Sequence, residues 1–401
     1  MKDCVLGIDA ANLLQGGGRT HLIELLRAAD PQAHGFSRVV VWGSSETLKL
    51  LEDRPWLCKL TPTALDGGLL QRAAWQMLVI DPAVRQQECD LLWVPGGSYV
   101  GGFRPVVLMS QNLLPFELRE LLRYGATLRT AKLAMLSFVQ GWSFSRSNGV
   151  IFLTRHAQDV VQEAVSTLPA SVAVIPHGLS ERFLEPPRPQ LPIDAYRHPA
   201  EPFRILYVSI VDQYKHQWHV VEAVARLRRL SGWNLSLDLV GPAYPSALRR
   251  LQRTMRAQDP DSTWLSYLGP VPYDQLDIFY RRSQLALWAS SCEAFGLILL
   301  EAMGAGLPVA SSDSPPMREI LAETGLYFDP EDLVSIGTTL QRLIAAPELR
   351  TSLATAAFNR ARSFSWQQCS EATFAFLASV YRSSSKPQGS ATEDPAVSCP
   401  V

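Results

Sequence analysis

Short, almost wholly apolar runs recur along the chain, and each ends in a polar or glycine-rich loop that leads into a helical pattern. In the first half these runs occupy residues 4–9, 38–42, 90–94, 106–109, 149–153 and 172–175. A strand that is apolar at consecutive positions is buried on both faces, as in a parallel sheet covered by helices. Strands that alternate with helices form βαβ units with right-handed crossovers. The first half is therefore predicted to be an α/β domain with a doubly wound sheet.

A proline-rich segment separates this half from a second one. Six of the residues 186–202 are prolines, and proline removes a backbone donor and fixes φ. The strand pattern then resumes at residues 203–211, 235–240, 265–268, 285–289 and 308–311. We predict an N-terminal Rossmann-like domain over 1–185, a linker over 186–202 and a second Rossmann-like domain over 203–364. The tail 383–401 lacks periodicity and apolar content, which predicts disorder.

Two such domains leave a cleft between the carboxyl ends of their sheets, where open α/β sheets bind ligands. Lys plus Arg number 37 and Asp plus Glu 38, so no whole-chain field attracts nucleic acid. Six cysteines form no CxxC pair and no cluster with zinc spacing, so no metal site is expected. Acidic residues interrupt any signal-peptide core and no apolar run is long enough to span a membrane, which predicts a cytoplasmic protein.

The segment 291–309, SCEAFGLILLEAMGAGLPV, is the most informative part of the chain. A strand ends just before Glu293, and Gly296 allows a tight turn into an apolar helix. The first N–H groups of that helix have no intrahelical partner and lie at the positive end of the helix dipole. We expect them to face the cleft as an anion site.

Two carboxylates in this segment carry the candidate chemistry. Glu301 has apolar neighbours on every side of its helix, which predicts burial. A buried carboxylate is costly unless it is hydrogen-bonded, so Glu301 either binds the hydroxyls of a ligand or is a structural residue bonded to a nearby loop. Glu293, eight positions earlier, lies either at the mouth of the cleft or in a solvent-facing loop.

The run Glu293-Ala-Phe-Gly-Leu, followed by Leu300-Glu-Ala-Met and Gly306-Leu-Pro-Val, resembles the donor-site signature of GT-B glycosyltransferases, and of the retaining family 4 in particular. Other parts of that pattern follow in order, namely 175–178, 205–209 with Lys215, 239–242, 267–271 and 326–330. The resemblance covers residues 4–381 and is strong over 150–332. It implies two Rossmann-like domains that face a central cleft, with the last helix, at 365–382, crossing back to the first domain.

The resemblance also implies where a nucleotide-sugar donor binds. Glu301 would hold the ribose hydroxyls, Glu293 would contact the transferred sugar and Lys215 would bind the diphosphate. The remaining donor-side positions are Gly17, Gly18, Ser209, Gly241, Val271 beside the base, and the backbone of Phe295, Gly296 and Leu297. Glu293 and Lys215 are the residues expected to act in catalysis.

Physical arguments support some of these assignments and leave others open. A lysine at a helix start, such as Lys215, is disfavoured by the dipole unless an anion binds there; the alternative is an ordinary surface lysine. The turn 15–18, before a helix at 21–29, contains three glycines whose N–H groups can bind an anion, or it is a flexible surface turn. The loop 95–98 lines the acceptor side or is likewise a surface turn.

Two departures from the family pattern concern catalysis. Ser209 and Ile210 stand where the family often has Gly-Arg, so a cation is missing near the diphosphate. Gln111 and Asn112 stand where a histidine often follows the fourth strand of the pattern. Neither amide titrates, although both can hydrogen-bond an acceptor or a sugar.

These features predict transfer of a sugar from a nucleoside diphosphate sugar to a hydroxyl acceptor, with retained configuration and without a cofactor or metal. The pair Asp259 and Asp261 resembles a metal motif only in form and is interpreted as a solvated turn. The alternatives are a GT-B epimerase acting on a nucleotide sugar and a non-catalytic GT-B scaffold. A nicotinamide enzyme is disfavoured because no GxGxxG occurs.

Residues 117–146 are rich in arginine and in apolar residues. A basic amphipathic helix can dock on anionic lipid and present a lipid-linked acceptor. The preferred interpretation is an ordinary domain helix that packs its leucines and phenylalanines into the core.

Overall fold

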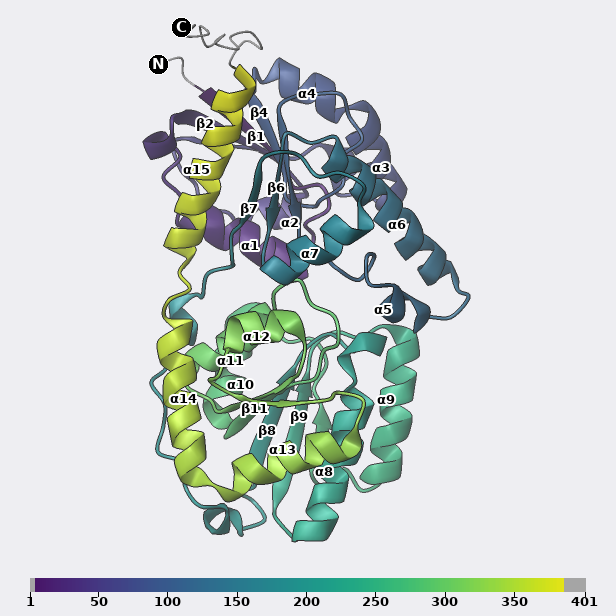
Figure 1. Cartoon of the computed structure of the whole chain (residues 1–401), viewed down its shortest axis with the longest axis vertical. Coiled ribbons are helices and arrows are strands. Elements are labelled where there is room, and N and C mark those ends of the chain that lie inside the picture. Colours follow the sequence, from purple (N-terminus) through teal and green to yellow (C-terminus); the bar gives the residue numbers. More distant parts are fainter. Residues whose placement is uncertain (1–3, 386–401) are drawn as a thin grey trace, which may run out of the picture.

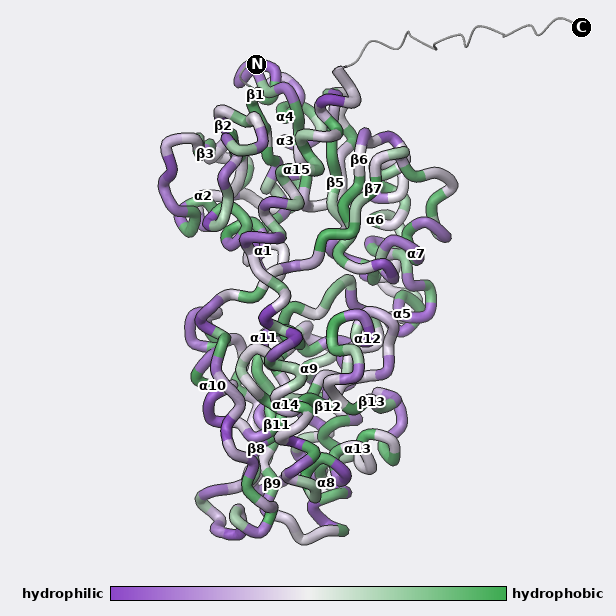
Figure 2. The backbone as a smooth tube through the Cα atoms, turned by 60° about the vertical axis from the view of Figure 1, so that its left-hand side comes forward, coloured by the Kyte–Doolittle hydropathy of each residue, from purple (hydrophilic) through white to green (hydrophobic). Residues whose placement is uncertain are grey.

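The computed structural model describes residues 4–385 and contains two parallel sheets in two lobes (Figure 1). The first sheet has seven strands in the order β3-β2-β1-β4-β5-β6-β7, and the second has six in the order β10-β9-β8-β11-β12-β13. The strands are apolar along most of their length in both lobes (Figure 2). The predicted α/β class, with two Rossmann-like sheets, is confirmed.

The first lobe contains the strands β1 (Cys4–Asp9), β2 (Phe36–Trp42), β3 (Leu57–Leu60), β4 (Leu91–Val94), β5 (Val106–Ser110), β6 (Gly149–Phe152) and β7 (Val172–Val174). Its α-helices are α1 (Gly16–Arg27), α2 (Ser45–Leu48), α3 (Leu69–Leu78), α4 (Ile80–Gln86), α5 (Leu118–Leu122), α6 (Leu128–Ser145) and α7 (Arg155–Ala164). Strands β4 and β5 are buried at every residue, which explains their uninterrupted apolar sequence. The sequence pattern missed β3 because this edge strand is only half-buried and contains Lys59.

The second lobe contains β8 (Phe203–Val208), β9 (Leu235–Val240), β10 (Leu265–Tyr267), β11 (Leu285–Trp288), β12 (Val309–Ser312) and β13 (Leu326–Phe328). Its α-helices are α8 (Gln217–Ser231), α9 (Pro245–Gln258), α10 (Leu276–Arg282), α11 (Leu297–Gly304), α12 (Pro315–Leu321), α13 (Leu333–Ala345) and α14 (Pro347–Ala361). Between the sheets, the proline-rich segment forms only a short 3-10 turn at Ile193–Tyr196. Strand β13, again at a sheet edge, was not predicted as a strand.

The last helix, α15 (Trp366–Ser385), leaves the second lobe and packs against α1 and β4 of the first (Figure 1). The chain therefore passes between the lobes twice. The two passages touch, because the Leu179 N–H donates to the Phe364 carbonyl at 2.9 Å. Helix α15 extends three residues into the segment predicted to be a disordered tail, and the remainder of that prediction lies outside the described residues.

Candidate active site

The turn into α11 is built as the sequence suggested. Strand β11 is wholly buried, and the chain then reaches Gly296 in a left-handed conformation with φ 98°. A Cβ atom at this position would lie 2.9 Å from the Met317 Cε, so both the conformation and the space favour glycine. No side chain caps the helix that begins at Leu297. Its first N–H groups therefore remain available to an anion.

Lys215 lies in a 3-10 turn (Gln213–Lys215) between β8 and α8, and it forms an ion pair with Glu293. The lysine is buried, with 4% of its surface exposed, and its ammonium lies 4.6 Å from the centroid of the Trp288 ring. The alternative of a surface lysine is therefore wrong. Because β8 and β11 are neighbours in the sheet, the two charges meet at the carboxyl ends of adjacent strands.

Glu301 is completely buried, as its apolar helix predicted. Its carboxylate accepts hydrogen bonds from the hydroxyls of Tyr273, at 2.7 Å, and Tyr280, at 3.1 Å. Burial raises the pKa of Glu301 to about 7, although these two bonds act in the opposite direction. The sequence did not reveal either tyrosine as a partner, because both belong to the segment after β10, remote from α11 along the chain.

Arg182 is a cation near Glu301 that sequence reasoning missed. Its guanidinium lies 3.9 Å from the centroid of the Tyr273 ring and helps to hold down the pKa of Glu301. The Arg182 Nε and Nη2 atoms are buried and have no hydrogen-bond partner within residues 4–385. No local signal marks this arginine, which follows the turn 175–178 in a short 3-10 segment, Glu181–Phe183.

The other predicted donor-side residues of the second lobe lie at the ends of neighbouring strands. The Ser209 hydroxyl accepts a hydrogen bond from Gln217 Nε2 at 2.8 Å. Gly241 comes so close that a Cβ there would be 2.2 Å from the Ser209 carbonyl oxygen. Phe295 is buried against His177, with ring centroids 4.9 Å apart, whereas Val271 and Leu297 are half-buried.

In the first lobe, the predicted glycine turn is wrong in one respect. Gly16, Gly17 and Gly18 form the first turn of α1 and do not precede it as a loop. A Cβ at Gly18 would lie 3.3 Å from Gln111 Oε1, and Gln111 Nε2 donates to the Pro95 carbonyl at 3.0 Å. The structure thus brings together Gly18, Gln111 and the loop 95–98. Asn112 is exposed, and its side chain accepts a bond from the Leu114 N–H.

A polar chain that runs from buried Asp9 through Gln76 to exposed Asn12 was not predicted. Asn12 Nδ2 donates to Gln76 Oε1 at 2.7 Å, and Gln76 Nε2 donates to Asp9 Oδ2 at 2.7 Å. Burial raises the pKa of Asp9 to about 6. The carboxylate fixes which way Gln76 points, and Gln76 in turn fixes the amide of Asn12. Asn12 is exposed, and its Cβ lies beside Gly96, 3.6 Å from where a Cβ on that glycine would stand.

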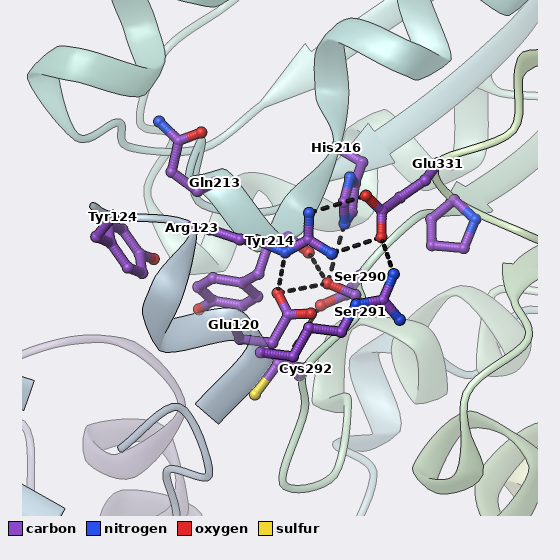
Figure 3. Close-up of polar contacts among 12 residues, drawn as sticks. Glu120, Arg123, Tyr124, Gln213, Tyr214, His216, Ser290, Ser291, Cys292 and Glu331 are labelled. Carbon is purple, nitrogen blue, oxygen red and sulfur yellow. Dashed lines mark hydrogen bonds and ion pairs between the residues drawn. The ribbon is translucent and has the colours of Figure 1, made fainter. Parts of the chain in front are cut away.

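Polar contacts from α5 connect the two lobes beside Tyr214 and His216, the two residues that flank Lys215 in the sequence (Figure 3). Arg119 and Arg123 both bind Glu331, with contacts of 2.8 and 2.9 Å. The Ser291 hydroxyl donates to Glu120 at 2.8 Å. The region 117–146 forms two helices, α5 and α6, instead of one, and Arg119 of α5 together with Arg123 just after it makes an interlobe contact.

Two sequence predictions concern a metal site and a membrane-spanning helix, neither of which was expected. Residues 4–385 contain no group of three or more His, Cys, Asp or Glu side chains arranged to hold a metal ion. Asp259 is buried and accepts bonds from the N–H groups of Thr263, Trp264 and Leu265. Its interpretation as a solvated turn is therefore wrong, since it organises the loop before β10. Within the same residues, no helix combines the length and apolar character needed to cross a bilayer.

The family model described as Glycosyl transferases group 1 matches residues 193–360. The chain is 32% identical over 110 residues to O-antigen chain mannosyltransferase B of Escherichia coli, which covers 27% of this chain and 29% of that protein. It is 26% identical over 256 residues to glycogen synthase of Mycobacterium tuberculosis, covering 62% and 58%. The chain thus spans less than two thirds of the length of these curated relatives.

Solved structures resemble almost the whole chain. Sucrose-phosphate synthase from Thermosynechococcus elongatus superposes with a TM-score of 0.76 at 16% identity, covering 95% of this chain and all of that one. Anabaena Alr3699/HepE in complex with UDP-glucose gives a TM-score of 0.69 at 16% identity, covering 95% and 99%. At this identity the likeness establishes the shared two-lobed fold.

Proposed function

We propose that this chain transfers a sugar from a nucleoside diphosphate sugar to a hydroxyl acceptor, because residues 193–360 match the glycosyl transferases group 1 model and the chain has the GT-B fold. The anomeric configuration is retained. The buried Lys215–Glu293 pair beside the uncapped start of α11 carries this proposal. It places a cation, a carboxylate and free backbone donors together at one edge of a sheet.

The diphosphate of the donor binds at the start of α11 and takes Lys215 as its counterion. Phosphate oxygens accept charge-assisted hydrogen bonds from an ammonium and from helix N–H groups. Lys215 then turns away from Glu293, which is freed to orient the transferred sugar. Lys215, which forms the ion pair with Glu293, thus becomes the counterion of the bound donor.

The ribose of the donor binds at Glu301. The ribose hydroxyls replace the Tyr273 hydroxyl as hydrogen-bond donors to this carboxylate. Tyr273 is the tyrosine that moves, because it lies in a short 3-10 turn, whereas Tyr280 belongs to α10. Arg182, stacked on Tyr273, follows the movement of that ring. Because Glu301 is fully enclosed, donor binding requires this local rearrangement.

In the reaction, the bond between the sugar and the diphosphate breaks first, through an oxocarbenium-like transition state. Lys215 and the α11 amides stabilise the charge that develops on the leaving phosphate, an effect of about 3 kcal/mol for a well-placed donor. The acceptor hydroxyl attacks the same face, and the departing phosphate oxygen takes its proton. These groups replace a metal ion in the proposed mechanism.

The acceptor binds in the first lobe at Gln111 and Asn112, which follow β5, and Gln111 lies beside the donor-side residue Gly18. We assign Asn12 to this side as well, because its carbonyl oxygen is held in one orientation. An amide that accepts from one side and donates from another suits a polyhydroxylated acceptor.

A thermal-shift screen with UDP-, GDP- and ADP-sugars tests donor binding, since a ligand that binds the folded state raises the Tm. UDP-glucose is the first probe, because it is the ligand named with Anabaena Alr3699/HepE. Absence of any shift would contradict the proposal. With a donor that binds, nucleotide release that depends on added acceptor supports transfer, whereas isomerisation of the donor sugar alone would indicate an epimerase. Binding without either reaction would indicate a scaffold.

A further inference from the structure

Helix α6 exposes an apolar stripe that the fold does not cover. Leu128, Met135 and Phe138 are 92%, 62% and 74% exposed, and Trp142 continues the same spacing one turn later. Positions separated by three, four or seven residues share one face of a helix. The opposite face packs inward through Leu133 and Phe144. The preferred interpretation from the sequence, a helix whose apolar residues enter the core, therefore holds for only one face.

Helix α5 extends this apolar surface. Leu118 and Leu122, one turn apart, are both largely exposed. The neighbouring face of α5 is the one that binds Glu331 through Arg119 and Arg123. The interlobe contact thus fixes α5 so that its leucines point outward. We call the exposed apolar residues of α5 and α6 the apolar ridge, namely Leu118, Leu122, Leu128, Met135, Phe138 and Trp142.

The charges next to the ridge are positive. Helix α6 contains 18 residues and none of them is Asp or Glu. Its exposed Lys132 lies one turn from Leu128 and Met135, and the Arg146 guanidinium lies 4.9 Å from the Trp142 ring centroid. Lysine and arginine near an apolar face keep their charged ends in water while their stems cover apolar surface.

Helix α9 of the second lobe also carries positive charge, in a series of arginines that we call the arginine row. Its 14 residues include four arginines and no acidic residue. Arg249, Arg253 and Arg256 are exposed and, with Gln252, line one surface recess. The net charge of the whole chain is only −1, so this row is a local concentration of positive charge.

The starts of α6 and α9 meet across the lobes. The Arg129 guanidinium, in the first turn of α6, lies 3.6 Å from the centroid of the Tyr244 ring, and Tyr244 is the residue that precedes α9. Arg129 also binds Asp212 at 2.6 Å. Helices α5, α6 and α9 lie along one side of the molecule (Figure 1).

We propose that the apolar ridge and the α9 arginines form one surface that docks on an anionic lipid bilayer. The ridge enters the interface between headgroups and acyl chains, as exposed apolar faces of basic amphipathic helices do. The arginines bind lipid phosphates, and each basic residue near such a surface strengthens binding about fivefold. A nucleic acid would use the arginines and leave the ridge exposed. The surface lies outside the proposed donor and acceptor residues, so it does not depend on the proposed function.

The experiment is sedimentation of the full chain with vesicles of phosphatidylcholine alone or mixed with phosphatidylglycerol. We expect binding to the mixed vesicles that weakens at high salt. The variant L128S/F138S should lose most of this binding, and R249E/R253E should weaken it more than about tenfold. The matched controls are I278S, at an exposed position of α10, and R362E/R382E, at exposed positions just after α14 and in α15. Both should bind like the parent protein.

Several results would overturn the proposal. These are failure of the parent chain to bind mixed vesicles, equal binding to neutral vesicles, and equal loss in the control variants. A ridge that mediates self-association would also overturn it; in that case the parent would sediment as a dimer in the ultracentrifuge and L128S/F138S as a monomer. Unchanged Tm values and circular dichroism spectra in all variants would show that each remains folded.

Discussion

The ammonium of Lys215 and the carboxylate of Glu293 form a buried ion pair, although the two residues are separated by 78 positions. Both side chains are largely shielded from solvent, with 5% of Lys215 and 15% of Glu293 exposed. A buried pair of this kind is costly to break, because removal of one partner leaves an uncompensated charge. A bound diphosphate offers Lys215 an alternative partner, so the same ammonium stabilises the folded protein and takes part in donor binding.

Removal of one member of this pair should therefore destabilise the protein more than removal of both. We expect K215M to lower the free energy of unfolding by about 3–5 kcal/mol, and K215M/E293Q to recover most of that loss. Neither variant should bind a nucleotide sugar. Urea unfolding and calorimetric titration with the donor measure the two effects separately. Equal stability of K215M and the parent would show that the pair is not formed in solution.

The pKa of Glu301, raised to about 7, makes stability depend on pH. Between pH 4.5 and 7 the folded protein holds a proton on Glu301 that the unfolded chain has released, so stability is full below this range and falls as pH rises through it. The loss is on the order of 3 kcal/mol. The variant E301Q should lack this pH-dependent loss of stability. The Tm of E301Q minus that of the parent should therefore increase from pH 5 to pH 8; a constant difference would contradict the assignment.

Gly296 should not tolerate a side chain. Alanine at a left-handed position costs about 1–2 kcal/mol, and its Cβ would also crowd Met317. We expect G296A to lower the Tm and to weaken donor affinity, since the first N–H groups of α11 would shift. The control is G337A in α13, where a Cβ meets nothing within 4 Å. Alanine there should be neutral or stabilising by up to about 1 kcal/mol.

Glu331 should hold the lobes together through Arg119 and Arg123. Hydrogen bonds from Arg123 lower the pKa of Glu331 to about 2, so its contribution is present above pH 4.5 and lost as pH falls below that value. Because the pair is partly exposed, the effect is only about 1 kcal/mol. E331Q should increase the radius of gyration in X-ray scattering, whereas E371Q, at an exposed position of α15, should not. An unchanged radius for E331Q would show that other contacts fix the lobes.

The sequence by itself determined the elements whose signals are local. The apolar runs gave most strands of both sheets, and the wholly apolar surroundings of Glu301 predicted its burial. Gly296 and the following helix were likewise correctly placed. These features depend on residues within one or two turns of each other, so the period of a strand or helix is enough to reveal them. The edge strands β3 and β13 were missed because they are short and only partly buried.

Only the tertiary structure decided which side chains meet. Lys215 binds Glu293 because β8 and β11 are adjacent in the sheet although β9 and β10 separate them along the chain. Tyr273 and Tyr280 reach Glu301 from the segment between β10 and β11, and Glu331 meets arginines more than 200 positions away. Such contacts depend on strand order and on the docking of one lobe against the other. Neither leaves a periodic trace in the residues concerned, because the partners lie in segments that each fold by their own local pattern.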